Sequence, residues 1–183
     1  MSYKVPVRDI QFVMNEVLDY STHYQKIPEG ESATPDMVTA IIEEMAKFSE
    51  KVLSPLNSIG DDKGCQFDDG KVTTPPGFKE AYDQYIQNGW PGLSAPEFIG
   101  GQGLPESLKY ITYEAQTSAN HAWSMAANLA SAALETILSH GTEEHHQYAK
   151  KMIEGKWGGT MCLTESHCGS DLGLLRTKAE PNA

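Results

Sequence analysis

The stretch "WSMAANLASAALETIL", residues 123–138, decides the fold class of this chain. Alanine has the highest helix propensity of all residues, and the stretch contains neither glycine nor proline to interrupt a helix. It predicts a helix over about residues 121–140 that ends at Gly141. Because small side chains let neighbouring helices approach closely, we expect this helix to lie at the centre of a mainly α-helical domain.

Helices are also predicted on both sides of this stretch. Over about residues 105–118, apolar residues recur at helical spacing, namely Leu108, Ile111 and Ala115. Downstream, Thr142 is a favourable N-cap residue for a further helix, and Gly155 marks its end. Tyr148 and Met152 are expected to face inward on that helix.

The segment "TPDMVTAIIEEMAKFSEKVLSPLN", residues 34–57, carries both a start signal and a stop signal. Thr34 is a favourable N-cap and Pro35 suits the first helical position. Pro55 is expected to stop the helix near the end of the segment. The apolar stripe of this helix consists of Met37, Ile41, Met45, Phe48 and Val52.

Two shorter helices complete the helical pattern. One is predicted to begin at Thr74 and Pro75, which repeat the start signal, and to end at Gly89. The apolar stripe of this helix consists of Phe78, Tyr82 and Tyr85. The other covers residues 8–20, with apolar residues at helical spacing: Ile10, Val13, Met14 and Val17, with Leu18 beside them.

The connecting segments contain no recognisable phosphate-binding motif. Residues 61–77 are expected to form a loop with one short extended piece. The glycine-rich "PEFIGGQGLP", residues 96–105, does not fit G-x-G-x-x-G because position 106 is Glu, and no Gly-Lys-Ser/Thr follows it. We expect a tight turn between helices there.

After Gly155 the helical pattern gives way to residues that favour strands. Extended segments are predicted at "KWGGTMCLTE", residues 156–165, and at "LLRTKAE", residues 174–180. Because strands need hydrogen-bonded neighbours, so few residues cannot build a covered sheet. The sequence thus predicts an extension with one helix over 1–34, an all-helical domain over 35–155, and the incomplete start of a β domain over 156–183.

The composition excludes several classes of function. The formal net charge of −11 disfavours nucleic acid and anionic membranes as partners, since both are bound by basic surfaces. The three cysteines are too few and too scattered for a disulfide framework. The chain has no apolar run long enough to span a membrane and no N-terminal signal segment, so the cytoplasm is the expected compartment.

The segment "TMCLTESHCGSDLG", residues 160–173, is the densest in reactive side chains. A metal site of Cys162, His167 and Cys168 lacks the second ligand pair usual for zinc, and the adjacent His145 and His146 would point apart on a helix. We therefore expect no metal site. A Cys168–His167 nucleophilic pair is disfavoured because adjacent residues of an extended loop face apart. Ser170 likewise lacks the G-x-S-x-G elbow.

The third interpretation of this segment is a cradle for a large cofactor. Backbone N–H groups and the hydroxyls of Thr164 and Ser170 suit a phosphate or the polar edge of a heterocycle. Gly169 would let the main chain approach a ligand without a Cβ clash. The residue chemistry permits this interpretation without singling it out.

The residues 161–173, "MCLTESHCGSDLG", closely resemble the flavin-contacting signature of the acyl-CoA dehydrogenases, an apolar strand followed by T-E-P-x-A/G-G-S-D. "GWPGLSAPEFIGGQGLP", residues 89–105, resembles the family pattern G...PE..GG.G, and "EEMAKFSEKVLSPLN", residues 43–57, resembles the first helix of its helical domain. These motifs are collinear over roughly residues 35–180. The leading segment resembles the longer subgroup that includes 3-(methylthio)propionyl-CoA dehydrogenase.

The resemblance implies an N-terminal helical domain, a middle β domain and a C-terminal helical bundle, with FAD between the latter two. Carried over by position, the cofactor contacts would be made by Met161, Leu163, Thr164, Gly169 and Ser170. In that arrangement Thr164 would hydrogen-bond the polar edge of the flavin. Ser170 would lie near both the pyrophosphate and the bound acyl-CoA. The helix around residues 123–138 would lie near the acyl pocket, although core packing explains its small residues equally well.

The chain departs from the family pattern in the middle of the signature. Ser166 replaces the usual Pro, and Cys168 replaces Ala or Gly. His167 occupies a variable position. These residues enlarge the loop and put its detailed geometry in doubt.

The implied reaction is α,β-dehydrogenation of an acyl-CoA thioester, with an electron-transfer flavoprotein as electron acceptor and a homo-oligomeric assembly. The family's catalytic base is a Glu of the C-terminal bundle, expected beyond Ala183, and Glu165 is not expected to replace it. This leaves the chain alone inactive. The alternatives are an acyl-CoA oxidase and a non-catalytic helical interaction module derived from the same family.

Overall fold

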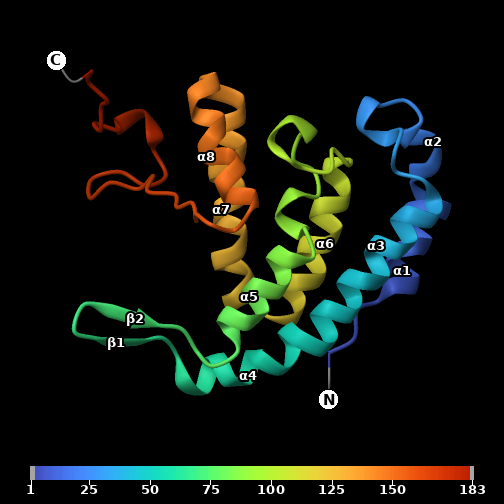
Figure 1. Ribbon diagram of the computed structural model, residues 1–183, viewed down its shortest axis with the longest axis horizontal. Helices are drawn as coiled ribbons and strands as arrows, with labels where there is room; N and C mark the ends of the chain where they lie inside the picture. The colour runs from blue at the N-terminus through green and yellow to red at the C-terminus, as the bar shows by residue number, and fades with distance from the viewer. Residues whose placement is uncertain (1–2, 182–183) are drawn as a thin grey trace.

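The computed structural model describes residues 3–181 as a bundle of helices with one small hairpin (Figure 1). The helices are α1 (Val7–Phe12), α2 (Tyr20–Tyr24), α3 (Pro35–Phe48), α4 (Ser54–Lys63), α5 (Phe78–Gln87), α6 (Glu106–Ala119), α7 (His121–His140) and α8 (Glu143–Ile153). Two π-helical segments, η1 (Val13–Val17) and η3 (Ser49–Leu53), continue α1 and α3. The hairpin strands are β1 (Gln66–Asp68) and β2 (Lys71–Thr73), and single 3-10 turns lie at Pro28–Gly30, Trp90–Gly92, Glu97–Ile99 and Leu172–Leu174. The mainly α fold predicted from the sequence is confirmed.

The long helix predicted to stop at Pro55 instead continues to Lys63. Proline has no N–H to donate, and in a regular α-helix its ring presses against the carbonyl four residues earlier. The turn just before Pro55 is the π-helical η3, in which the Ser54 N–H donates to the Ser49 carbonyl five residues back. This wider register loosens the turn. As a result α3, η3 and α4 follow one another as a single rod along one side of the bundle (Figure 1).

The main core lies where α3 and η3 face α5, α6 and α7. Phe48, Tyr85 and Trp123 meet there, with the Tyr85 and Trp123 rings packed edge to face at a centroid distance of 5.4 Å. Trp123 also donates from its indole N–H to the Phe78 carbonyl over 3.1 Å. Such aromatic groups contribute large apolar areas, so these residues hold α3, α5 and α7 together.

The junction between α6 and α7 depends on one buried amide. The side-chain oxygen of Asn120 accepts the Trp123 N–H over 3.0 Å and so caps α7. Its Nδ2 donates to the Leu53 carbonyl of η3 over 3.2 Å. Since Asn120 is only 1% exposed, water cannot replace either bond.

The alanine-rich helix α7 packs between α6 and α8, which accounts for its small residues only in part. A Cβ placed on Gly159 would lie 2.6 Å from the Ala133 Cβ and 2.7 Å from the Met152 Cε. The chain that follows α8 therefore crosses α7 in direct contact, because both partners are small. The opposite face, including Met125, is exposed, so α7 is less central than we expected.

On two helices, the buried face differs from the apolar stripe that the sequence predicts. The buried side of the α3 rod includes Val38, Ile42 and Leu53, and Met37 is exposed, so the buried face is displaced from the predicted stripe. In α8 the predicted inward residue Tyr148 is 39% exposed and stacks on Trp157 at a centroid distance of 5.6 Å.

The first helical segment is also buried on a narrower face than predicted. Met14 is buried, but Val13, Val17 and Leu18 of the predicted stripe are exposed. The helix predicted over 8–20 ends at the η1 segment, and Asp19 then caps the short α2 with a left-handed backbone (φ +46°). Both α2 and α3 lie against this segment, while Val13, Val17 and Leu18 remain exposed.

The hairpin projects from the lower part of the bundle (Figure 1). Phe67 pairs directly with Val72, and both side chains are exposed. The predicted loop over 61–77 is thus partly wrong: its first residues belong to α4, and two strands form instead of one extended piece. The next helix begins at Phe78, after Gly77 with φ +85°, rather than at the Thr74–Pro75 signal.

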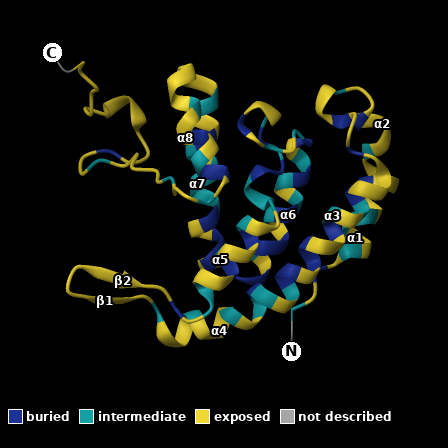
Figure 2. Cartoon of the chain, viewed as in Figure 1, coloured by how far each residue is buried: buried dark blue, intermediate teal, exposed yellow. Residues whose placement is uncertain are grey.

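The strands predicted at 156–165 and 174–180 are not formed. Between Lys156 and Pro181 the structure contains only an isolated bridge between Glu165 and Cys168 and one 3-10 turn. A strand requires a neighbour for its N–H and C=O groups, and the described residues offer none to this tail. Figure 2 shows the tail and the hairpin as mostly exposed, whereas buried residues gather where the long helices face one another. None of the described helices combines the length and apolarity required to cross a lipid bilayer.

Candidate functional site

The predicted cofactor segment begins as an extended, outward-facing chain. Successive side chains of extended backbone alternate in direction, so Met161 and Leu163 share one side and Cys162 and Thr164 share the other. Met161 is 58% exposed and Leu163 is 42% exposed. No hydrogen bond joins the backbone N–H groups of residues 161–164 to any other residue within 3–181. The segment therefore presents apolar side chains beside free backbone donors.

A tight turn follows this extended segment. The N–H of Glu165 donates to the Cys168 carbonyl over 2.9 Å, and the N–H of Cys168 donates back over 3.2 Å. The Glu165 carboxylate accepts the backbone N–H groups of Arg176 and Thr177 and the Thr177 hydroxyl, the last over 2.6 Å. The hydrogen bonds from Thr177 and Arg176 lower the pKa of Glu165. The Glu165 carboxylate thus fixes the tail and is occupied as an acceptor.

The structure brings together only part of the metal-ligand set considered from the sequence. One ligand atom each of Glu165, His167 and Cys168 lies within 4.8 Å of the others, but Cys162 is not in this group. The Nε2 of His167 lies 2.9 Å from the Leu174 carbonyl, a contact that requires this nitrogen to carry a proton. Because a protonated nitrogen and a fully hydrogen-bonded carboxylate are poor ligands, these contacts favour a structural role for the cluster.

The two histidines of α8 are engaged elsewhere. His145 Nδ1 accepts the Thr142 N–H over 2.9 Å in a capping box that starts the helix. The ring of His146 packs against Phe98 at a centroid distance of 5.3 Å. Cys168, the considered nucleophile, is buried, whereas reactive thiolates are accessible and lie in electropositive surroundings.

The remaining predicted contacts, Thr164, Gly169 and Ser170, are all exposed. A Cβ on Gly169 would meet only Thr164, at an ordinary distance of 3.5 Å, so no described neighbour requires a glycine there. Gly169 has no positive φ either. Exposed hydroxyls, free backbone donors, a side-chain-free position beside Thr164 and the apolar side chains of Met161 and Leu163 are features that suit a flat heterocycle with a polar edge. These residues therefore fit a flavin.

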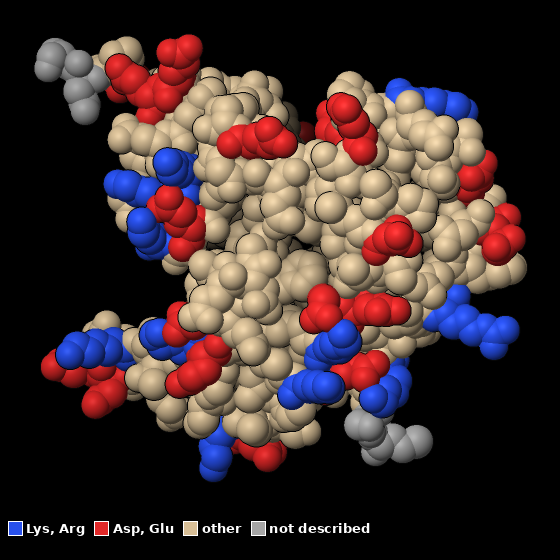
Figure 3. All heavy atoms as spheres, turned by 45° about the vertical axis from the view of Figure 1, so that its right-hand side comes forward, with Lys and Arg blue, Asp and Glu red and all other residues tan. Residues whose placement is uncertain are grey.

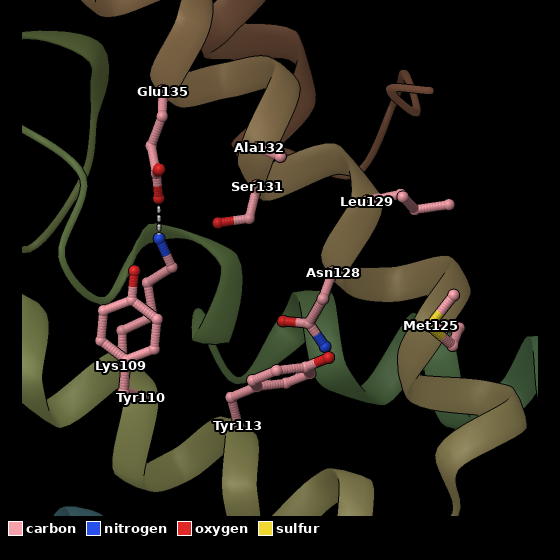
Figure 4. A pocket seen from close by; sticks show the side chains of 9 residues that line it. All are labelled: Lys109, Tyr110, Tyr113, Met125, Asn128, Leu129, Ser131, Ala132 and Glu135. Atoms are coloured by element: carbon pink, nitrogen blue, oxygen red, sulfur yellow. Dashed lines mark hydrogen bonds and ion pairs between the residues drawn. The ribbon is translucent and has the colours of Figure 1, made fainter. Parts of the chain in front are cut away.

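A second candidate site lies between α6 and α7 (Figure 4). This pocket has a volume of about 210 Å³. Its walls are formed by Lys109, Tyr110, Tyr113, Met125, Asn128, Leu129, Ser131, Ala132 and Glu135. Sequence reasoning placed the α7 stretch near an acyl pocket but did not identify the polar wall. The available signal was the i, i+3, i+7 spacing of Asn128, Ser131 and Glu135 on one face of an otherwise apolar helix.

Lys109 closes one end of this pocket by joining the two helices. Its Nζ donates to Glu106 on α6 over 2.5 Å and to Glu135 on α7 (Figure 4). Burial of Lys109 opposes its charged form, but the hydrogen bonds to the two glutamates outweigh burial and raise its pKa. The ammonium group is therefore charged and fixed in place.

A larger cleft of about 710 Å³ lies between the hairpin, α5 and the start of α7. Its walls include Val72, Phe78 and Trp123. Figure 3 shows acidic side chains scattered over the face it displays, with no continuous basic patch. The displayed face agrees with the formal net charge of −11.

Comparison with known proteins finds similarity over almost the whole chain. Residues 35–156 match the family model described as "Acyl-CoA dehydrogenase, N-terminal domain". Similar curated proteins include the 3-methylmercaptopropionyl-CoA dehydrogenase of Ruegeria pomeroyi, 35% identical over 99% of this chain and 31% of the relative. The broad-specificity linear acyl-CoA dehydrogenase FadE5 of Mycobacterium tuberculosis is 33% identical over 99% of this chain and 30% of the relative. A butyryl-CoA dehydrogenase of Syntrophomonas wolfei is 31% identical over 98% of this chain and 30% of the relative. The chain thus spans about a third of the length of these relatives.

Proposed function

Because this chain belongs to the acyl-CoA dehydrogenase family, we propose that it is the N-terminal part of an FAD-dependent enzyme that dehydrogenates acyl-CoA thioesters between the α and β carbons. The observation that carries the proposal is the outward-facing segment from Met161 to Ser170, with its apolar side and its free polar edge. When bound, FAD supplies the hydride acceptor for this reaction.

In this proposal the tail residues bind and orient the cofactor. Met161 and Leu163 cover one face of the ring system, and the Thr164 hydroxyl hydrogen-bonds its polar edge. Gly169 lets the backbone approach, and Ser170 lies between the pyrophosphate and the acyl-CoA. Glu165 does not touch the reactants, since its carboxylate is held by Arg176 and Thr177.

The helix α7 is proposed to lie near the acyl chain. Its residues Ala130 and Ala133 lie against Gly159 at the start of the tail, so this face of the helix adjoins the cofactor segment. A rigid helix in contact with the tail would help to fix the acyl chain relative to the cofactor segment, which is the geometric contribution that the protein makes to such reactions.

The general base belongs, in this proposal, to a part of the polypeptide beyond Ala183. We accordingly expect the 183-residue chain to be inactive by itself. An electron-transfer flavoprotein as electron acceptor, a homo-oligomeric state and a cytoplasmic location are further elements of the proposal, all inferred from the family resemblance and the composition. The substrate is not fixed by the family, because the relatives are named for different acyl groups.

The test uses the product of the intact reading frame that contains this chain. We expect a yellow protein whose flavin absorbance bleaches when an acyl-CoA thioester is added without oxygen. Substitution of Gly169 by Val, which fills the open position beside Thr164, is expected to lower the FAD content, whereas Gly158→Val should leave it unchanged because no atom lies within 4 Å of the Gly158 Cβ position.

Two results would favour the alternatives. Stoichiometric peroxide release during turnover in air would assign the protein as an acyl-CoA oxidase. A purified intact product that takes up no flavin, and bleaches with no thioester, would contradict both enzymes and leave the helical interaction module.

A further inference from the structure

The residues that follow the extended cofactor segment form a four-residue turn. The Cys168 N–H donates to the Glu165 carbonyl over 3.2 Å, which is the hydrogen bond that defines a closed β-turn. Ser166 and His167 are therefore its two central residues. Neither has a positive φ, so the turn types that need a left-handed central residue are excluded, and type I is the commonest that remains. A type I turn favours proline at its first central position.

This chain has serine at that position, so no ring fixes the backbone φ of residue 166. Within residues 3–181 the Ser166 N–H donates to no other group, so its backbone amide is not restrained by a hydrogen bond either. The pattern T-E-P-x-A/G-G-S-D, which the segment resembles, has proline at the corresponding position. The turn therefore needs another restraint if its shape is to be fixed before a ligand binds.

The side chain of His167 supplies such a restraint. Its Nε2 lies 2.9 Å from the Leu174 carbonyl and 3.5 Å from the Glu165 carboxylate. Because both partners are acceptors, this nitrogen carries the proton. The imidazole thus joins the second central residue of the turn to the far end of the loop that contains Gly169 and Ser170.

The helical bundle does not share in this restraint. Among the residues that the structure describes, every hydrogen bond of segment 165–177 is made to another residue of the same segment. Figure 1 shows this part of the tail apart from the long helices. The bonds of Glu165 join the two ends of the segment, and the bond of His167 closes a smaller ring around residues 168–173. The shape of the loop consequently depends on these few internal bonds.

We propose that His167 is a positioning residue for the cofactor and that it provides, in this chain, the restraint that a proline at position 166 would otherwise provide. By tying the turn to Leu174, it holds the Gly169 backbone and the Ser170 hydroxyl in the arrangement that a flavin site requires. This inference rests on the function proposed above. His167 acts through the loop and not on the reacting atoms.

The test measures the dissociation constant of FAD for the intact product, after removal of the bound cofactor, by following flavin fluorescence. His167→Ala removes the imidazole donor. Because one intramolecular hydrogen bond changes an equilibrium constant by up to about tenfold, we expect FAD to bind about three- to tenfold more weakly. His167→Gln keeps an N–H donor and should recover part of this affinity. The matched control is His140→Ala, at the exposed end of α7, which should leave FAD binding unchanged.

Substitution of Ser166 by Pro is the sharper test. It removes only an N–H that donates to no group within residues 3–181, so the turn can accept it. In the His167→Ala background, Ser166→Pro should tighten FAD binding by about two- to fivefold, because the ring removes conformational freedom from the unbound loop. In the unaltered background the gain should be smaller, since His167 already restricts the same turn and effects on one element are not additive.

A role of His167 in overall stability alone would give a different result. The urea midpoint of the helices, followed at 222 nm, should be the same with and without His167→Ala, because segment 165–177 has no hydrogen bond to the bundle within the described residues. A loss of FAD affinity that only follows a lowered midpoint would overturn the inference. Should His167→Ala fail to fold, His167→Gln is compared with His167→Met, which is of similar size but has no N–H donor, and equal FAD affinities of these two would overturn it.

The remaining outcomes separate the inference from the proposed function. An FAD dissociation constant of His167→Ala within twofold of the unaltered value would overturn the inference and leave the flavoprotein function standing. The same holds if Ser166→Pro has equal effects in both backgrounds. If the unaltered intact product takes up no FAD, the proposed function is refuted, and the inference with it.

Discussion

Replacement of Asn120 by Ala tests whether one buried amide holds the α6–α7 junction to the rest of the bundle. The substitution removes the acceptor that caps α7 at Trp123 and the donor to the Leu53 carbonyl. Loss of an N-cap typically costs about 1 kcal/mol. A buried group left without a partner costs about 1–3 kcal/mol. Since Asn120 is 1% exposed, we expect the free energy of unfolding to fall by about 2–4 kcal/mol.

The assay is urea unfolding followed by circular dichroism at 222 nm and by tryptophan fluorescence, with the midpoint and the slope fitted together. The midpoint should fall while the slope stays constant, which is the sign of a change in stability alone. Asn120→Ser is the matched variant, because serine keeps the cap but cannot reach Leu53 in the same way. The free energy of unfolding of the Asn120→Ser variant should lie between those of the unaltered chain and of Asn120→Ala.

The reasoning would be refuted if the free energy of unfolding of Asn120→Ala differed from that of the unaltered chain by less than about 0.5 kcal/mol, which is the range of ordinary surface substitutions. Equal losses of unfolding free energy in Asn120→Ser and Asn120→Ala would also contradict it. The helix cap would then contribute no stability beyond that of the hydrogen bond to Leu53.

Two further perturbations test the helix end and the tail. Gly155→Ala places a Cβ 2.5 Å from Ile86 at a backbone φ of +69°, so we expect a loss of about 2 kcal/mol or more by urea unfolding, and a stability within 0.5 kcal/mol of the original would contradict this. The lowered pKa of Glu165 means that its bonds to Arg176 and Thr177 are fully present above the ordinary glutamate pKa and are lost as the pH falls through the lowered value. The protection of the amides at residues 176 and 177 from hydrogen exchange, taken relative to an unstructured chain at the same pH, should fall over that acidic range, and Glu165→Gln, which keeps an acceptor oxygen but does not titrate, should abolish this pH dependence.

Local sequence signals predicted the helices well where the residues involved act within one or two turns. The alanine-rich stretch, the Thr142 cap and the glycine at the end of α5 each act on their nearest neighbours, and the structure places α7, α8 and the end of α5 as they indicate. The same local reasoning failed at Pro55, because the π turn that accommodates this proline has no simple sequence signature.

For the candidate site, the sequence predicted which residues form the cofactor segment and which chemistry they offer. Their surroundings came only from the structure, which shows the Glu165 carboxylate tied to Thr177 and the predicted strands unpaired. Hydrogen bonds between residues eleven or twelve positions apart depend on how the tail folds back, and strand formation depends on a neighbour. Neither the path of the tail nor the presence of a neighbouring strand can be predicted from the local sequence pattern.

The sequence by itself determined the fold class, the positions of the long helices and, through three collinear motifs, the family. It could do so because helix propensity, capping and motif spacing act along the chain over a few residues. Only the tertiary structure decided which faces are buried, where Gly159 meets α7, and that Lys109 and Glu135 close a pocket from two different helices. Those features depend on distances between segments that are remote in sequence, and packing geometry alone sets such distances.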